Sequence, residues 1–371
     1  MTYNLKPDER ASLELRGLYE KYGYKKYKMG KFEEYSLYAS NSDFLSGERV
    51  ITFTDLDGRL LALKPDVTLS VMNNTDVTGN KTEKLYYIEN VYRENRESHS
   101  FKEISQMGLE YLGNVTKQGI LEVIVLAAQT LNEISEDNIL EINNMDYGVH
   151  LMESLNLKES TYLKILNAIR HKNSAAIREH GSKAQVPENV LETLTKLPFL
   201  YGKPDDALMR AEKLALNDKM LEDVEKLRMY CNALKELGYE QNIRLDLSMI
   251  NDIDYYNSIT FRGYVRSLPG CVIAGGQYDK AMKVLGKEGN AIGFAVYLDE
   301  LVKGHEAPSH YDVDAVLYYK EDDDMVKVTE AIATIQAEGK TVRGITSDED
   351  ILYKEKYVLR NGNPVKEVEE C

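Results

Sequence analysis

Four segments that lie far apart along the chain contain most of its candidate binding residues. A fold that uses them in one site must bring all four together. The segments are residues 60–68, residues 91–94 with 106–110, residues 254–256, and residues 274–279 with 293–301. The two halves of the second segment fall on predicted strands, residues 84–93 and 101–112. If the four segments come together in the fold, they form one candidate site.

The residue types in these segments suit a small amino acid. A zwitterion needs a carboxylate for its ammonium group and a cation for its own carboxylate. A histidine side chain also needs an acceptor for a ring N–H and an aromatic wall. Asp66, Glu110 and Arg93 would supply the charged groups, and Tyr256 would supply the wall. This set could bind a small amino acid whose side chain carries a ring N–H.

Each of these residues also has a simpler interpretation. Asp66 follows a proline and could be an acidic residue in the first turn of a helix, where the helix dipole favours it. Glu110 lies between two apolar residues of a predicted strand and could face solvent. Tyr255 and Tyr256 could be core aromatics. Taken one at a time, these residues leave both interpretations open.

Composition and charge exclude several classes of protein. The chain has 371 residues, enough for more than one domain, with a formal charge of −15. That charge argues against a broad nucleic-acid surface, because such surfaces depend on lysine and arginine contacts to phosphates, although a local basic groove remains open. The three cysteines form no CxxC pair, and the six histidines show no metal-binding spacing. Without an apolar leader or a long apolar run, the chain is expected to be cytoplasmic, with neither metal nor cofactor.

Two phosphate-binding signatures are absent from the sequence. No two glycines stand two residues apart, so there is no GxGxxG, and no GxxxxGK occurs. The Gly275-Gly276 pair alone is weak, since most such pairs form turns. The pair becomes evidence for a site only together with the Gln-Tyr-Asp that follows it and with Gly293-Phe-Ala further along.

Apolar periodicity outlines the rest of the chain. It predicts an opening helix at 7–22, a strand pair at 49–53 and 60–63 joined by an Asp-Gly turn, and a helix at about 120–134. Residues 150–240 have a helical pattern without recognisable chemistry. Strands are predicted again at 243–250, 258–265 and 271–274, followed by a helix near 277–285. After a linker near 304–311, residues 313–345 predict a small βαβ-like tail.

The four segments resemble the active site of class II aminoacyl-tRNA synthetases of the histidyl-tRNA synthetase type. They also resemble the non-catalytic relatives of these enzymes, the regulatory subunits of ATP phosphoribosyltransferase. The resemblance implies that Asp66, Thr68 and Gln106 hold the α-amino group of histidine. It implies that Arg93 faces the carboxylate end. Glu110 would bind the imidazole ring, and the ligand-binding residues carried over from the family are Asp66, Thr68, Arg93, Gln106, Glu110, Tyr255 and Tyr256.

Three departures from the synthetase pattern decide between the two groups. Amino-acid activation needs cations around ATP to offset the triphosphate charge. The synthetases have arginines where this chain has Asn251, Gln277 and Glu300, and another arginine has become Lys64. The resemblance therefore implies that the amino-acid part of the site is kept and that the adenylation activity is lost.

The resemblance implies an α+β fold, a class II synthetase-like antiparallel sheet of about six strands flanked by helices, plus a small C-terminal α/β domain. The core would span residues 1–305, with the mostly helical segment at about 150–240, and the tail domain residues 311–371. The tail is short and acidic, whereas the synthetases carry a longer anticodon-binding domain here. An acidic tail would repel an RNA stem.

The function implied is a non-catalytic regulatory subunit of ATP phosphoribosyltransferase, the enzyme that condenses ATP with phosphoribosyl pyrophosphate at the first step of histidine biosynthesis. The expected partner is a short-form catalytic subunit, L-histidine is a possible effector, and a homodimer within a hetero-oligomer is expected. Two alternatives stay open. One is a working histidyl-tRNA synthetase, and the other is a stand-alone histidine-binding sensor.

Overall fold

The computed structural model describes residues 5–41, 49–77, 81–95, 98–155, 157–250, 255–303 and 311–367. Contacts divide the chain into two compact units, Met1–Gly304 and His305–Cys371. The helices of the first unit are α1 (Pro7–Lys21), α2 (Tyr35–Ala39), α3 (Val67–Asn74), α4 (Lys117–Ile134), α5 (Met145–Glu153), α6 (Glu159–Arg170), α7 (Ser174–Lys183), α8 (Glu188–Lys196), α9 (Pro204–Leu214), α10 (Asp218–Glu236), α11 (Asp279–Val284) and α12 (Leu298–Lys303). Its strands are β1 (Lys25–Lys26), β2 (Phe32–Glu34), β3 (Thr52–Thr54), β4 (Leu60–Leu63), β5 (Thr82–Asn95), β6 (Ser100–Gly113), β7 (Asn138–Asn144), β8 (Tyr201–Gly202), β9 (Ile243–Asp246), β10 (Asn257–Val265), β11 (Cys271–Gln277) and β12 (Asn290–Tyr297).

The first unit is built on one large sheet. Within the described residues its strand order is β1-β5-β6-β12-β11-β10-β7-β9-β8. The six strands from β5 to β7 pair antiparallel, as expected from the sequence. The sheet is larger than the six strands predicted, because β1 and β9 add parallel pairs at its ends and β8 adds one further strand. A separate three-stranded sheet has the order β2-β4-β3.

Alternating residues of the long strands build two cores on opposite faces of the sheet. Tyr86 on β5 packs into the core formed with α1 and α4, where its ring lies 6.3 Å from that of Tyr19. The next residue, Tyr87, belongs to the core formed with α3 and α11. This division follows from the two-residue repeat of a strand, which turns successive side chains to opposite faces. The second face is the one that bears the candidate site.

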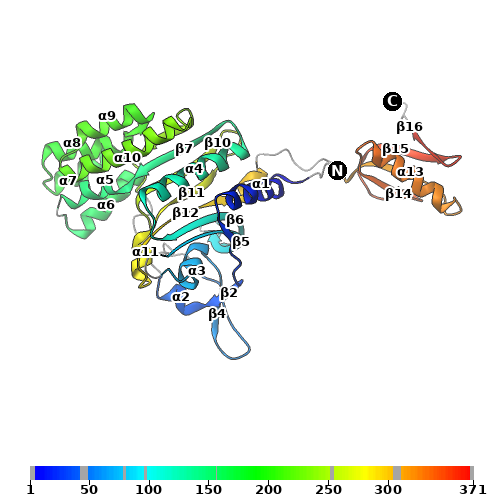
Figure 1. Ribbon diagram of the computed structural model, residues 1–371, viewed down its shortest axis with the longest axis horizontal. Helices are drawn as coiled ribbons and strands as arrows, with labels where there is room; N and C mark the ends of the chain where they lie inside the picture. Colours follow the sequence, from blue (N-terminus) through cyan, green and yellow to red (C-terminus); the bar gives the residue numbers. More distant parts are fainter. Residues whose placement is uncertain are drawn as a thin grey trace. The chain divides into compact units, whose positions relative to one another are not determined.

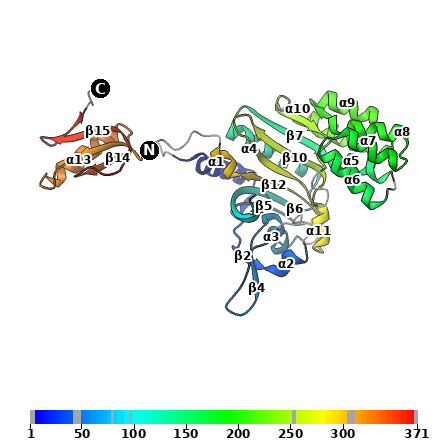
Figure 2. The ribbon, with the colours of Figure 1, turned by 180° about the vertical axis from the view of Figure 1, so that it is seen from behind.

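Helices α5 to α10 form the helical segment predicted for residues 150–240. Figures 1 and 2 show α6 to α9 gathered beyond the β7 end of the sheet, away from α2 and α3. Their apolar faces join the core under α4 through residues such as Ile165, Leu194, Leu208 and Leu227. The segment is therefore an extension of the first unit rather than an independent core.

Two strand predictions need correction. The strand predicted at 243–250 ends at Asp246, because the Asp246 carboxylate accepts a hydrogen bond from the Ser248 amide at 2.9 Å and closes a turn. The strand predicted at 49–53 is the shorter β3. Asp55 and Gly58 form the turn between β3 and β4, as predicted.

The second unit has a four-stranded sheet of order β14-β13-β15-β16 packed on one helix. Its elements are β13 (Val313–Tyr318), α13 (Met325–Ala337), β14 (Val342–Ile345), β15 (Tyr353–Arg360) and β16 (Asn363–Glu367). The β13–α13–β14 part matches the predicted βαβ pattern, since β13 and β14 are parallel. The hairpin of β15 and β16 was missed. Its turn residues, Asn361 and Gly362, both have positive φ, which is the backbone that an Asn-Gly pair favours in a two-residue hairpin turn.

Candidate functional site

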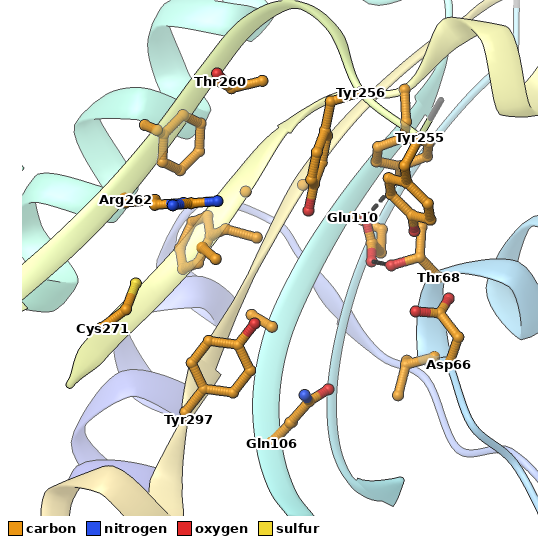
Figure 3. Close-up of a pocket in the computed structure, with 18 of the residues that line it drawn as sticks. Asp66, Thr68, Gln106, Glu110, Tyr255, Tyr256, Thr260, Arg262, Cys271 and Tyr297 are labelled. Carbon is orange, nitrogen blue, oxygen red and sulfur yellow. Dashed lines mark hydrogen bonds between the residues drawn. The ribbon is translucent and has the colours of Figure 1, made fainter. Parts of the chain in front are cut away.

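A cavity of about 340 Å³ opens on the second face of the large sheet, between α3 and strands β6, β10, β11 and β12 (Figure 3). A volume of this size is typical of small-molecule sites. All seven of the ligand-binding residues predicted from sequence line it: Asp66, Thr68, Arg93, Gln106, Glu110, Tyr255 and Tyr256. The structure therefore brings together three segments that the sequence separates by up to 190 residues, from Asp66 to Tyr256.

The start of α3 positions Asp66 and Thr68. Asp66 is the N-cap of the helix, and its Oδ1 atom accepts a hydrogen bond from the Leu69 amide at 2.8 Å. Its Oδ2 atom accepts a bond from Arg93 Nη2 at 3.2 Å, while Arg93 Nε donates to the Pro65 carbonyl oxygen at 2.8 Å. Asp66 is therefore both the N-cap of a helix and a residue that lines the cavity. Its Oδ1 atom caps α3, and its Oδ2 atom pairs with Arg93.

Glu110 is buried at the centre of the same wall, with 1% of its surface exposed. Thr68 donates to its Oε1 atom at 2.7 Å, and the Tyr278 hydroxyl donates to its Oε2 atom. Burial raises the pKa of Glu110 from its ordinary value to about 8, although both hydrogen bonds oppose this shift and the nearby Asp66 adds to it. The interpretation of Glu110 as a solvent-facing strand residue is wrong.

Three tyrosines form the aromatic side of the cavity. The rings of Tyr255 and Tyr256 meet edge to face with centroids 4.7 Å apart, and Tyr255 lies 6.1 Å from Tyr278. Both Tyr255 and Tyr256 are only partly buried and pack against the second core. They therefore act as core aromatics on one side and as cavity walls on the other.

Glycines let the strands that form the floor of the cavity lie close to these side chains. A Cβ atom on Gly293 of β12 would lie 2.5 Å from the Leu109 carbonyl oxygen and even closer to the Glu110 carboxylate. A Cβ atom on Gly275 of β11 would overlap the backbone of β12. Gly293 of the Gly-Phe-Ala pattern thus makes room for Glu110, and Gly275 of the Gly-Gly pair allows β11 to lie close to β12.

Of the positions where the resemblance implies a lost or changed synthetase arginine, those that the structure describes lie outside the cavity lining. Gln277 is buried and accepts a hydrogen bond from the Ile259 amide at 3.3 Å. Glu300 on α12 forms an ion pair with Lys303 and lies against Gly270. Lys64 is fully buried and pairs with Glu89 at 3.0 Å, which ties β4 to β5. Asn251 and its neighbour Asp254 lie outside the described residues.

The sequence analysis missed several cavity residues on the opposite wall. The most distinctive are Thr260 and Arg262 on β10, Cys271 on β11, Tyr278 after it, and Tyr297 at the end of β12. A signal for Arg262 was present, because a cation in the middle of the otherwise apolar strand 258–265 is unusual. Among the described lining residues, Arg93 and Arg262 are the two cations.

No cluster of three or more histidine, cysteine, aspartate or glutamate residues that could hold a metal ion occurs in the described part of the chain. Within the same ranges, none of the helices has the length and apolar character needed to cross a membrane.

Comparison with known proteins places the chain in a family. A sequence model described as histidyl-tRNA synthetase matches residues 4–301. A relative from Caldanaerobacter subterraneus is 30% identical over 293 residues, covering 77% of this chain and 76% of the relative. Another, from Clostridium acetobutylicum, is 28% identical over 360 residues, covering 94% and 87%. Both are named ATP phosphoribosyltransferase regulatory subunit.

Solved structures share the fold. A Bacillus halodurans protein described as an ATP phosphoribosyltransferase regulatory subunit/histidyl-tRNA synthetase has a TM-score of 0.78 at 21% identity, covering 95% of this chain and 93% of that one. A chain from the ATP phosphoribosyl transferase (HisG:HisZ) complex of Thermotoga maritima has a TM-score of 0.63 at 21% identity, covering 80% and 98%. The class II synthetase-like fold predicted from sequence is confirmed. The chain belongs to the histidyl-tRNA synthetase family and, within it, to the ATP phosphoribosyltransferase regulatory subunits.

Proposed function

We propose that this chain is the non-catalytic regulatory subunit of an ATP phosphoribosyltransferase and acts at the first step of L-histidine biosynthesis. The observation that carries the proposal is that the site keeps groups suited to an amino acid but lacks the arginines that ATP would need. Glu110, Thr68 and Tyr278 form a preformed polar cluster suited to a small amino acid. Gln277 and Glu300, which replace synthetase arginines, have protein partners outside the described cavity lining.

The loss of those arginines argues against adenylation by this chain. Activation of an amino acid builds negative charge at the α-phosphate of ATP beside an already charged triphosphate, and only fixed cations offset it. Of the two arginines that line the described cavity, Arg93 is paired with Asp66. The phosphoribosyl transfer would therefore be catalysed by a separate, short-form partner chain, in keeping with the similarity of this fold to a chain of an ATP phosphoribosyl transferase (HisG:HisZ) complex.

L-histidine is the ligand that we assign to the cavity. Its ammonium group would bind Asp66, with Thr68 and Gln106 beside it, and its ring N–H would bind Glu110. The aromatic wall of Tyr255 and Tyr256 would cover the ring. Histidine bound here would transmit feedback inhibition to the partner in the cytoplasm, where this pathway operates.

A homodimer within the hetero-oligomer is part of the proposal. Phe32 and Phe53 pack edge to face with ring centroids 5.0 Å apart, yet they are 55% and 36% exposed. They share one face of the small β2-β4-β3 sheet with Leu61 and Leu63. An apolar strip of this kind suits a second copy of the chain. Light scattering should show a dimer that Phe53→Glu weakens, whereas Leu237→Glu, at an exposed leucine after α10, should leave it intact.

Reconstitution tests the central proposal. Adding this chain to a purified short-form catalytic subunit should raise its ATP phosphoribosyltransferase activity and make that activity sensitive to histidine. The control is the catalytic subunit with an unrelated acidic protein. Unchanged activity would show that the proposed function is wrong. Histidine-dependent exchange between ATP and pyrophosphate by this chain alone would instead favour the synthetase alternative.

A further inference from the structure

We propose that Lys226 on α10 is a positioning residue for the aromatic wall of the cavity and acts through the backbone at Ser258. This inference deepens the proposed function and rests on it, because it assumes that L-histidine binds against Tyr255 and Tyr256. It also gives the helical segment of α5 to α10, in which the sequence shows no recognisable chemistry, a part in binding the ligand.

Ser258 has a backbone conformation that residues with side chains rarely adopt. Its φ angle is +56°, in the left-handed region, and only 3% of its surface is exposed. A residue other than glycine stays in this region only when its surroundings hold it there, and such residues cluster at binding sites. Ser258 is the second residue of β10 and follows Tyr256 by two positions. Its backbone therefore sets how the chain passes from the aromatic wall into the sheet.

The pairing of β10 with β11 is irregular at the same place. The register of the two strands shifts within residues 257–260. The Ile259 amide donates to the side-chain oxygen of Gln277 at 3.3 Å. An irregularity of this kind changes the direction of the side chains next to it. Here those side chains include Tyr255 and Tyr256, which line the cavity (Figure 3).

Two helices hold Ser258 in this conformation. Lys226 Nζ on α10 donates to the Ser258 hydroxyl oxygen, and the Ser258 amide donates to Asp146 Oδ1 on α5 at 3.2 Å. The bond to Asp146 uses only the backbone, whereas the bond from Lys226 needs the hydroxyl. Because Lys226 is half-buried and carries a charge, its hydrogen bond is stronger than one between neutral groups at an open surface.

A buried polar network joins α5 and α10 to each other. The fully buried Asn144 side chain accepts from the Asp146 amide at 3.3 Å and donates to Asp223 Oδ1 at 3.2 Å. Asp223 lies on the same helix as Lys226, and its Oδ2 atom is 2.6 Å from His150 Nδ1 on α5. These bonds fix the two helices to each other without Lys226. Removal of the Lys226 ammonium group should therefore alter the aromatic wall and leave the helices in place.

Isothermal titration of the full-length protein with L-histidine tests the proposal. Lys226→Met keeps the length of the side chain but removes the donor, so it should weaken histidine binding about 2- to 10-fold, the effect of one hydrogen bond. Lys226→Arg keeps a donor and should recover part of the affinity. In a Ser258→Ala background, Lys226→Met should cause no further loss, because both changes remove the same bond. Lys219→Met, at an exposed lysine in the first turn of α10, is the matched control and should bind histidine like the wild type.

Two variants of Ser258 separate positioning from stability. Ser258→Ala and Ser258→Gly both remove the hydroxyl, but only glycine adopts a positive φ without strain. Ser258→Gly should therefore unfold at a higher urea concentration than Ser258→Ala, whereas both should bind histidine more weakly than the wild type. A merely structural role would instead make the histidine affinity of each variant follow its stability.

The positioning role is overturned if Lys226→Met binds histidine as tightly as the wild type, or if Ser258→Gly does. In either case the proposed function stands, because the wild-type protein still binds histidine. If the wild-type protein binds no histidine, this inference and the effector role both fail, whereas the partner's activation in the reconstitution is decided separately.

Discussion

The two walls of the cavity differ in how their polar groups are satisfied. On the wall formed by α3 and β6, Thr68 and Glu110 bond to each other, and Asp66 is bonded to Arg93. On the wall formed by β10, the Thr260 hydroxyl is buried without a partner in the described residues. The polar groups of the first wall are therefore satisfied within the protein, whereas the second wall keeps a buried hydroxyl that has no partner among the described residues.

The largest expected effect concerns the protonation of Glu110, which lies on the first wall. Its pKa is about 8 in the folded protein against 4.5 ordinarily, so the folded state binds more protons than the unfolded state between these values. The free energy of unfolding should therefore fall as pH rises from about 5 to 9, by at most about 5 kcal/mol at about 1.4 kcal/mol per pKa unit. Glu110→Gln removes this contribution, since an amide does not ionise.

Urea denaturation of both proteins across this pH range gives the measurement. The wild type should lose stability relative to Glu110→Gln as pH rises. Glu133→Gln, at an exposed glutamate on α4, controls for the loss of one charge. A pH-independent difference between the wild type and Glu110→Gln would mean that Glu110 is not buried as the structure shows.

A smaller effect is expected at Gly293, where β12 packs against β6 of the first wall. Gly293→Ala places a methyl group against the Leu109 carbonyl oxygen and the Glu110 carboxylate, so β6 and β12 must move apart. Overpacking of this kind costs about 1–3 kcal/mol. Gly17→Ala on α1 meets no atom within 4 Å and should instead stabilise the protein by about 0.5–1 kcal/mol. Thermal unfolding compares the two, and equal effects would contradict the close contact at Gly293.

The contrast between the walls also explains which parts of the site could be predicted from sequence. The first wall depends on short contiguous patterns, so Asp66, Thr68 and Glu110 were found together. The burial of Glu110 could not be predicted, because apolar residues flank it on both sides and leave the face of its strand ambiguous. Arg262 was missed because its environment depends on the pairing of β10 with β11, whose partners are fixed only by the folded sheet.

Elsewhere in the chain, features with a local sequence signal were also predicted better than features that depend on distant residues. The helices were predicted well because their signals are local, as with Pro7 at the start of α1. The buried ion pair of Lys64 with Glu89 joins residues 25 apart in sequence on different sheets, so no local pattern indicates it. The hairpin of β15 and β16 had a local signal, the Asn361-Gly362 pair, so sequence alone could have prevented this omission.

The smallest expected effects compare one threonine from each wall. Thr68→Val removes the hydroxyl that donates to Glu110 at 2.7 Å, so it should destabilise the ligand-free protein by about 1 kcal/mol. It should also raise the pKa of Glu110 further, because that hydrogen bond favours the ionised carboxylate. Thr260→Val replaces a buried hydroxyl without a partner by a methyl group of similar shape, so it should be neutral or stabilising.

The difference between these two variants should appear in the ligand-free protein. Differential scanning fluorimetry of Thr68→Val and Thr260→Val beside the wild type measures it. If Thr260→Val destabilises the ligand-free protein as much as Thr68→Val does, its hydroxyl has a partner inside the protein. The wall formed by β10 would then be as complete as the wall formed by α3 and β6.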